Sequence, residues 1–246
     1  MQFDAQLIET LRGARHVAVL TGAGVSAESK IPTFRDAMTG LWARYRPEEL
    51  ATPQAFAANP KLVWDWYQWR RGLVEAAAPN EGHKALARLA DLVPRLTLIT
   101  QNVDSLHQRA GSPEVVELHG NISRTKCARE GRIVASWPDT DQVPPPCPHC
   151  GAHLRPDVVW FGESLPPEAL RQAADAARRC DVFFSIGTSA LVQPAASLIY
   201  ETMRRGGMTV ELNPGETPQS DEVTHSLRGP SGVILPALLH AAWPEA

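Results

Sequence analysis

The chain has 246 residues, 43% of them hydrophobic, which is typical of one large globular domain or of one domain with an insertion. Its 24 basic and 27 acidic residues give a net charge of −3, so nothing indicates a basic surface for nucleic acid or membrane lipid. No apolar run approaches the roughly 18 residues of a membrane-spanning helix. Residues 1–6 lack the pattern of a signal peptide, and we therefore expect a cytoplasmic protein.

Short apolar runs alternate with helical patterns along much of the chain. In chain order we expect a helix at 4–13, a strand at 16–20, a helix at 82–92 and a strand at 96–99; then a helix at 166–179, a strand at 182–186, a helix at 194–205 and a strand at 208–212. This alternation predicts an α/β fold with a Rossmann-like parallel sheet and helices on both faces. Because polar or glycine-containing loops follow the strands, we expect these loops to meet in one crevice.

Two segments interrupt this alternation. Residues 36–75 form an aromatic-rich helical insertion, and residues 121–157 contain three of the four cysteines and little helical periodicity. We expect these insertions to form a small domain, the second of them resembling a zinc ribbon. Residues 1–35, 76–120 and 158–246 would then form a Rossmann-like domain.

A glycine-rich loop follows the first predicted strand. Gly22 and Gly24 would permit a tight turn and a close approach of phosphate oxygens to backbone N–H groups. The full G-x-G-x-x-G pattern is absent because residue 27 is alanine, and no acidic residue ends the next strand where a ribose-binding residue usually lies. An ordinary hydride-transferring dehydrogenase is therefore a poor fit, and the glycines alone are equally compatible with a simple tight turn.

Polar residues with catalytic potential follow the second predicted strand. Asn102 could hold a water or a carboxamide, and Asp104 could orient a ribose or an amide. His119 ends the apolar run at 115–118, and a histidine titrates near neutrality, as general-base work on a hydroxyl requires. A lone histidine is more often structural or solvated, which is how we interpret the other seven. His119 differs from these seven because it both ends an apolar run and lies shortly after Asn102 and Asp104 in the sequence.

Several motifs, in order, resemble those of the sirtuin family of NAD-dependent protein lysine deacylases, over residues from about 12 to 240. They are Gly22-Ala23-Gly24-Val25-Ser26, Pro32-Thr33-Phe34-Arg35, Gln101-Asn102-Val103-Asp104, His119-Gly120, Val159-Trp160-Phe161-Gly162-Glu163, Gly187-Thr188-Ser189 and Leu212-Asn213.

The resemblance implies a role for each matching residue. The catalytic residues would be His119, as the general base, and Asn102. The NAD site would be lined by Gly22, Ala23, Gly24, Thr33, Phe34, Arg35, Gln101, Asn102, Asp104, Gly187, Thr188, Ser189, Asn213 and Ser231. The substrate peptide would pair as an added strand along Val159, Phe161, Gly162 and Glu163.

The resemblance also implies the reaction. The acyl-lysine oxygen would attack C1′ of the nicotinamide ribose and release nicotinamide. His119 would then activate the ribose 2′-hydroxyl, and water would complete the transfer to give free lysine and an acyl-ADP-ribose. The expected partners are acylated-lysine proteins or peptides, without direct binding to nucleic acid or membranes.

One pair of residues bears on the acyl group. Tyr67 and Arg70 lie three residues apart and share a helix face, where a guanidinium and a phenol suit a carboxylate. The sirtuin branch that removes succinyl, malonyl and glutaryl groups carries this pair, and Ala37 resembles the small residue that widens its acyl pocket. We therefore expect preference for acidic acyl groups with some deacetylase activity. The alternative is an aromatic helix face packed in the core, with Arg70 solvated.

The cysteines suggest a metal site with an incomplete ligand set. Cys147 and Cys150 form a zinc-knuckle pair, but Cys127 is followed by Glu130 where a second such pair would place a cysteine. Glu130 could supply the fourth ligand, His149 or His153 could replace it, or the metal could be weak or absent. We expect structural Zn²⁺ bound by Cys127, Cys147 and Cys150 plus one other group.

Other functions remain open at this point. The chain could act mainly as a deacetylase, or as a mono-ADP-ribosyltransferase, although Tyr67 and Arg70 would then have no role. A non-catalytic NAD sensor and a flavin or nicotinamide oxidoreductase are further alternatives. The oligomeric state is not readable from the sequence.

Overall fold

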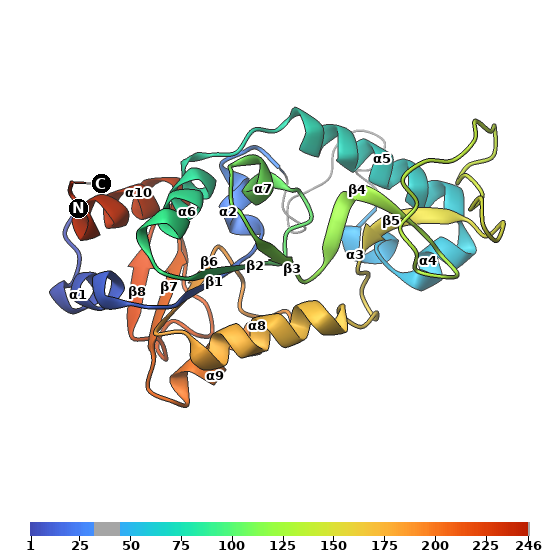
Figure 1. Cartoon of the computed structure of the whole chain (residues 1–246). Coiled ribbons are helices and arrows are strands. Elements are labelled where there is room, and N and C mark those ends of the chain that lie inside the picture. Colours follow the sequence, from blue (N-terminus) through green and yellow to red (C-terminus); the bar gives the residue numbers. More distant parts are fainter. Residues whose placement is uncertain (32–44, 246) are drawn as a thin grey trace.

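A computed structural model describes residues 1–31 and 45–245, and in it six parallel strands form one sheet with helices on both faces (Figure 1). The four strands expected from the sequence are present, with ends shifted by no more than one residue, and two short strands extend the sheet at its edges. The strands are β1 (Val17–Thr21), β2 (Leu96–Thr100), β3 (Val115–Glu117), β6 (Val182–Ile186), β7 (Met208–Asn213) and β8 (His225–Arg228).

The strand order is β3-β2-β1-β6-β7-β8, so the chain runs outward in both directions from the centre. At that centre Val17 of β1 pairs with Leu96 of β2 on one side and with Val182 of β6 on the other. This is the order of dinucleotide-binding Rossmann sheets, which bind ligands at the carboxyl ends of the strands where the order reverses. The expected α/β fold class is confirmed, and the expected crevice would lie beyond the ends of β1 and β6.

Apolar side chains of alternate strand residues pack on opposite faces of this sheet. Val17 and Val19 lie in one cluster, whereas Ala18 and Leu20 lie in another, and this two-sided burial explains the continuous apolar run. The first cluster packs under α1 (Ala5–Gly13), α6 (Glu81–Leu92) and α10 (Ser231–Ala242), and the second under α8 (Pro167–Arg179) and α9 (Leu198–Met203).

The helix expected at 194–205 is shorter than predicted. A 3₁₀ turn (Ala195–Ser197) precedes α9, and α9 ends at Met203. Gly206 adopts φ +73°, and its N–H donates to the carbonyl of Met203 while that of Gly207 donates to Thr202. A left-handed glycine of this kind closes a helix by satisfying its last carbonyls.

Beyond one end of the main sheet lie three helices and a separate two-stranded sheet (right side of Figure 1). These are α3 (Pro47–Leu50), α4 (Pro53–Ala58), α5 (Pro60–Ala76), and the antiparallel pair β4 (Gly120–Cys127) and β5 (Leu154–Val158). Asn59 caps α5 and Pro60 begins it. Its inner face follows helical spacing and consists of Val63, Trp66, Tyr67, Arg70 and Val74. The apolar members pack with Ile122, Val158 and Trp160, whereas Trp64, which is also buried, packs in another apolar cluster.

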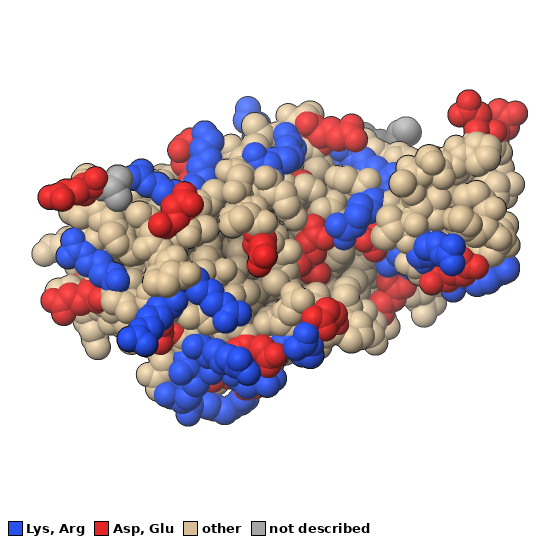
Figure 2. Space-filling view, viewed as in Figure 1, with Lys and Arg blue, Asp and Glu red and all other residues tan. Residues whose placement is uncertain are grey.

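The visible surface is charged but mixed in sign. Figure 2 shows basic side chains gathered over α8 and α9. Three arginines of these helices pair with acids of the same region: Arg171 with Glu168, Arg178 with Asp175, and Arg204 with Glu201. None of the helices in the described part of the chain has the length and apolar character needed to cross a bilayer.

Candidate active site

The loops that follow β1 and β6 are in backbone contact. The N–H of Gly22 donates to the carbonyl of Ile186 (3.0 Å), and that of Gly24 donates to Gly187 (2.9 Å). A Cβ on Gly24 would lie 2.7 Å from Gly187 Cα, closer than real side chains come. The two glycines of this loop are therefore required by contact between two loops at the centre of the sheet, a role the sequence alone did not reveal.

The amide of Asn102 ties the loop after β2 to the loop after β1. Its Nδ2 donates to the Gly22 carbonyl (3.0 Å) and to Ser26 Oγ (3.1 Å). Ser26, buried on the short helix α2 (Ala23–Ala27), donates in turn to Asp104 Oδ2 (2.6 Å). Asp104 uses its other oxygen to accept from the N–H of Leu106, at the start of α7 (Leu106–Arg109). The structure thus brings Asn102 and Asp104 together, with Ser26 as the link.

His119 is half-buried and held in one orientation. Its Nδ1 lies 3.0 Å from the carbonyl of Gln101, which can only accept, so Nδ1 carries the proton and Nε2 keeps a free lone pair. Burial lowers the pKa of His119, although the Gln101 carbonyl opposes the shift. The ring is therefore neutral at pH 7, as a general base must be. The N–H of Val159 donates to the His119 carbonyl (2.9 Å), which places the expected peptide-binding segment beside it.

Two buried histidines underlie this network. Both are among the seven that we interpreted as structural or solvated, and the sequence did not indicate their contacts with these polar residues. His83 Nε2 lies 3.4 Å from Ser26 Oγ, and His107 Nε2 lies 2.9 Å from Thr21 Oγ1. Burial lowers the pKa of His83 to about 4 and that of His107 to about 3, so both are neutral. One sequence signal was available, because His83 stands at the third position of α6 and completes a capping box with Asn80.

The remaining predicted NAD residues lie mainly on loops after β6 and β7. The side-chain amide of Asn213 donates to the Thr188 carbonyl (3.2 Å), which joins these two loops. Ser231 begins α10 and its hydroxyl donates to Glu28 (3.1 Å). Ala23 starts α2, Gln101 follows β2, and Ser189 follows Thr188. The predicted residues Thr33, Phe34 and Arg35, and also Ala37, lie outside the described residues.

Tyr67 and Arg70 share the inner face of α5, as their spacing predicts. The side chain of Arg70 is buried, with 7% of the residue exposed, and its guanidinium lies 5.4 Å from the Trp66 ring centroid. Arg70 is therefore not solvated, contrary to the alternative considered above. Tyr67 is buried beside it, and its hydroxyl accepts a hydrogen bond from the Trp160 indole.

In the segment that follows β5, some side chains are exposed to solvent and others make contacts within the protein. Phe161 is 47% exposed, and its N–H donates to the Ala51 carbonyl (2.9 Å), while Gly162 adopts φ +87°. Glu163, expected along the peptide, forms a two-pronged ion pair with Arg155 (2.6 and 2.9 Å). In this arrangement Glu163 braces the segment from within.

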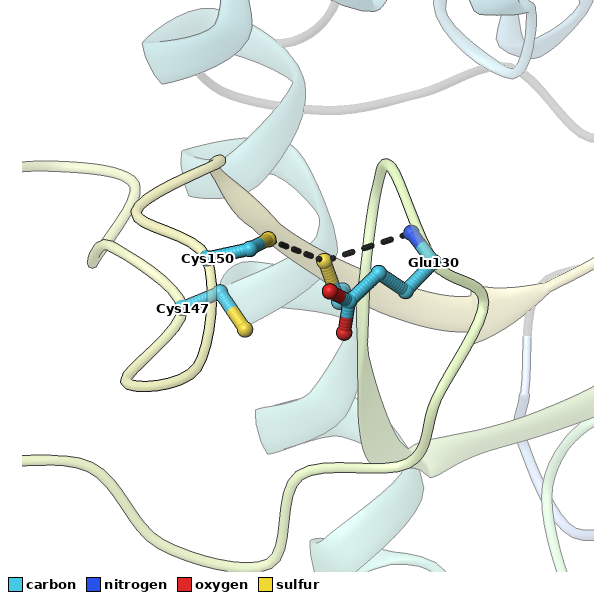
Figure 3. Close-up of side chains that lie close together, drawn as sticks. Glu130, Cys147 and Cys150 are labelled. Atoms are coloured by element: carbon cyan, nitrogen blue, oxygen red, sulfur yellow. Dashed lines mark hydrogen bonds between the residues drawn. The ribbon is translucent and has the colours of Figure 1, made fainter.

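Three cysteines and Glu130 converge on one point (Figure 3). The ligand atoms of Cys127, Glu130, Cys147 and Cys150 all lie within 4.8 Å of one another, and the sulfurs of Cys127 and Cys150 are 3.4 Å apart. Tetrahedral zinc with bonds of about 2.3 Å would place sulfurs about 3.8 Å apart, so this donor set fits a zinc ion. The two histidines considered as alternative ligands lie outside this group. His149 is exposed, and the ring of His153 packs edge-on against Phe56.

Comparison with known proteins gives this geometry a context. The model of the Sir2 family matches residues 22–194. A NAD-dependent protein deacylase of Methylococcus capsulatus is 51% identical over 249 aligned residues, covering 98% of each chain. NAD-dependent protein deacylase 1 of Pseudomonas aeruginosa is 49% identical, covering 97% of this chain and 98% of that one.

The chain belongs to the Sir2 family. Solved structures agree with this assignment. A Sir2 homologue in complex with NAD superimposes with a TM-score of 0.91 at 48% identity, covering 98% of this chain and 94% of the other. A Sir2 complex with a p53 peptide and NAD gives 0.83 at 32% identity, covering 97% and 98%. The expected resemblance to sirtuins is thereby confirmed.

Proposed function

We propose that this Sir2-family chain removes acyl groups from protein lysines in an NAD-dependent reaction, and that it prefers acidic acyl groups such as succinyl and malonyl. The observation that carries the proposal is the neutral, oriented His119 beside the Asn102–Ser26–Asp104 network at the centre of the sheet. The relatives named NAD-dependent protein deacylases support the reaction type. The buried Tyr67 and Arg70 support the acyl preference.

In this proposal the protein positions groups and moves one proton. Bound NAD would supply the nicotinamide leaving group and the ribose carbon that receives the acyl oxygen. Nε2 of His119 would accept the ribose proton, while the Gln101 carbonyl holds Nδ1–H and keeps the ring in the required tautomer. Asn102 already donates to Gly22 and Ser26, which leaves its carbonyl oxygen to hold a water or the nicotinamide amide.

The acyl preference follows from buried charge. A guanidinium keeps its positive charge at physiological pH, and an anion beside it recovers part of the free energy lost on burial. Arg70 and Tyr67 together offer a charged fork and a phenol to a carboxylate. An acetyl group has no such anion, so we expect it to be a usable but poorer substrate.

The deciding experiment compares succinyl-lysine and acetyl-lysine versions of one peptide with NAD, and follows the products by mass spectrometry. We expect faster removal of succinyl, with nicotinamide and acyl-ADP-ribose formed in equal amounts. Arg70→Met should lower the succinyl kcat/KM about tenfold or more, and the acetyl value much less. Equal losses would assign Arg70 to packing, and ADP-ribose attached to protein would favour the transferase alternative.

We further propose that the cysteine cluster holds structural zinc with Glu130 as fourth ligand. Two turns of the same form support this. Cys127 and Cys147 each begin a four-residue turn whose following glycine, at φ +68° and +72°, donates its N–H back to that cysteine's carbonyl. Glu130 therefore occupies, in the first turn, the position that Cys150 occupies in the second. Zinc would join the two turns and hold the small domain, whose separate sheet also supports the expected domain division.

Metal content and spectroscopy test this ligand set. Glu130→Ala should weaken zinc binding at least about tenfold in competition with a chelator, whereas His149→Ala should not. In the cobalt-substituted protein, Glu130→Cys should intensify the sulfur-to-cobalt absorption, because a fourth thiolate replaces an oxygen ligand. Unchanged zinc affinity in Glu130→Ala would remove Glu130 from the site. Three of the four cysteines would then be zinc ligands and none is in a disulfide, which fits a reducing compartment and the expected cytoplasmic location.

A further inference from the structure

Trp160 makes a directional contact with the phenol of Tyr67. The indole Nε1–H donates to the Tyr67 oxygen at 3.0 Å, and the two rings are tilted by 33° with centroids 6.4 Å apart. Both side chains are nearly inaccessible, with 2% of each residue exposed. A hydrogen bond in such a dry environment is strong and fixes the positions of both groups.

Trp160 is itself clamped by its own segment. Its backbone N–H donates to Glu163 (2.8 Å), and the guanidinium of Arg155 lies 3.2 Å from the centroid of its ring. Arg155 is in turn fixed by Glu163 and by the Val158 carbonyl (2.8 Å). Among the described residues the buried Nε of Arg155 has no hydrogen-bond partner, which costs free energy, so the surrounding contacts must hold the guanidinium in this stacked position.

The contact decides what the Tyr67 hydroxyl can do. An indole N–H can only donate, so the phenol oxygen must accept, and its own proton is free to point elsewhere. Burial raises the pKa of Tyr67, which keeps that proton in place. No acceptor for it is found among the residues that the structure describes. A phenol prepared in this way suits a ligand that only accepts, such as a carboxylate.

We propose that Trp160 is a positioning residue for acyl selectivity: its indole N–H holds the Tyr67 hydroxyl so that the phenol proton is directed to an acidic acyl group. This role rests on the proposed preference for acidic acyl groups. It also assigns Arg155 and Glu163 to the support of that selectivity, through the ring that they hold.

A double-mutant cycle tests the role. Tyr67→Phe should lower the ratio of succinyl to acetyl kcat/KM about tenfold, because it removes a hydrogen bond to a charged group. Trp160→Phe keeps a ring but loses the N–H, and should lower the same ratio about fivefold. In the Tyr67→Phe background, Trp160→Phe should change the ratio less than about twofold, because the hydroxyl it positions is gone.

A matched control is available on α5, the helix that carries Tyr67. Trp64→Phe makes the same change near Trp137, in another apolar cluster, and should leave the ratio unchanged. The role is overturned if Trp160→Phe keeps the wild-type ratio, lowers both substrates equally, or lowers the ratio as much without Tyr67 as with it. If the wild-type enzyme itself shows no succinyl preference, the proposed preference fails and this role fails with it.

Discussion

A single backbone carbonyl sets the chemistry of His119. The Gln101 carbonyl accepts from Nδ1, and Gln101 follows directly on β2, whose ladder to β1 continues through the Gln101 N–H to the Thr21 carbonyl (3.0 Å). The tautomer of His119, the proposed base, is therefore fixed by the sheet itself. A side-chain partner could be lost by one substitution, whereas this backbone partner remains as long as the strand pairs.

Removal of the imidazole should abolish turnover without unfolding the protein. His119→Ala should reduce the formation of deacylated peptide and acyl-ADP-ribose about 10²–10⁴-fold, the usual contribution of a general base. The urea unfolding midpoint should stay close to that of the wild type, because the ring is only half-buried. His240→Ala, on the exposed side of α10, serves as the control, and wild-type rates in His119→Ala would refute the assignment.

The pH dependence of kcat/KM should report the same group. A general base works in its neutral form, and burial lowers the pKa of His119 below its ordinary 6.5. The rate should therefore fall on acidification with an apparent pKa below 6.5, and it should be level through neutral pH. A limb centred above 6.5 would show that a different group, or a charged His119, controls the reaction.

At the scale of elements, the central part of the sheet was predictable and its edges were not. The runs at 96–100 and 182–186 are apolar because strands inside the sheet are covered on both faces. The edge strands β3 and β8 are short and half-buried, and His225–Arg228 alternates between intermediate and exposed residues. Such segments become strands because they pair with an adjacent strand, and the sequence does not reveal which segments pair.

The same limit applies to the site. Asn102, Asp104 and His119 follow strands, and this position made them candidates from the sequence. Ser26 and His83 matter because they meet across 57 positions of sequence, and no local periodicity records such a contact. Glu130 is an intermediate case, since its turn repeats the spacing of Cys147–Gly151.

The glycine loop can be tested as an element. Gly24→Ala should lower the free energy of unfolding by about 1–3 kcal/mol and weaken NAD binding, because the new methyl group meets the backbone of Gly187. Gly72→Ala in α5 is the matched control. Nothing lies within 4 Å of its added Cβ, so it should stabilise by about 0.5–1 kcal/mol. Equal effects at the two positions would show that the loop contact is unimportant. Calorimetric unfolding measures both variants.

At the scale of the whole molecule, the two buried histidines make stability depend on pH. In the unfolded chain both protonate near pH 6.5, whereas in the fold their pKa values are about 4 and about 3. The unfolded state therefore binds more protons in this range. The stability that they contribute is complete above pH 6.5 and is lost progressively as the pH falls to about 4 for His83 and to about 3 for His107.

Urea unfolding at pH 7, 6 and 5 should show this loss directly. His107→Gln can keep the hydrogen bond to Thr21, but a glutamine side chain does not titrate. Unfolding of this variant therefore takes up one proton fewer than unfolding of the wild type. Its free energy of unfolding should fall less steeply as the pH is lowered, by about 1.4 kcal/mol per pH unit. His240→Gln should keep the wild-type slope. If His107→Gln also keeps it, His107 is not the group that protonates on unfolding.

The pairing of β1 with β6 has a consequence for synthesis. Val17 of β1 pairs with Val182 of β6. The central strand β1 is therefore synthesised early, but its pairing is completed only when about three-quarters of the chain has been synthesised. Contacts between such distant residues close slowly. Until β6 arrives, β1 presents an unpaired apolar edge that can bind other nascent chains. The strand junction that brings the loops of the candidate site together is thus also a part of the sheet that is completed late in synthesis.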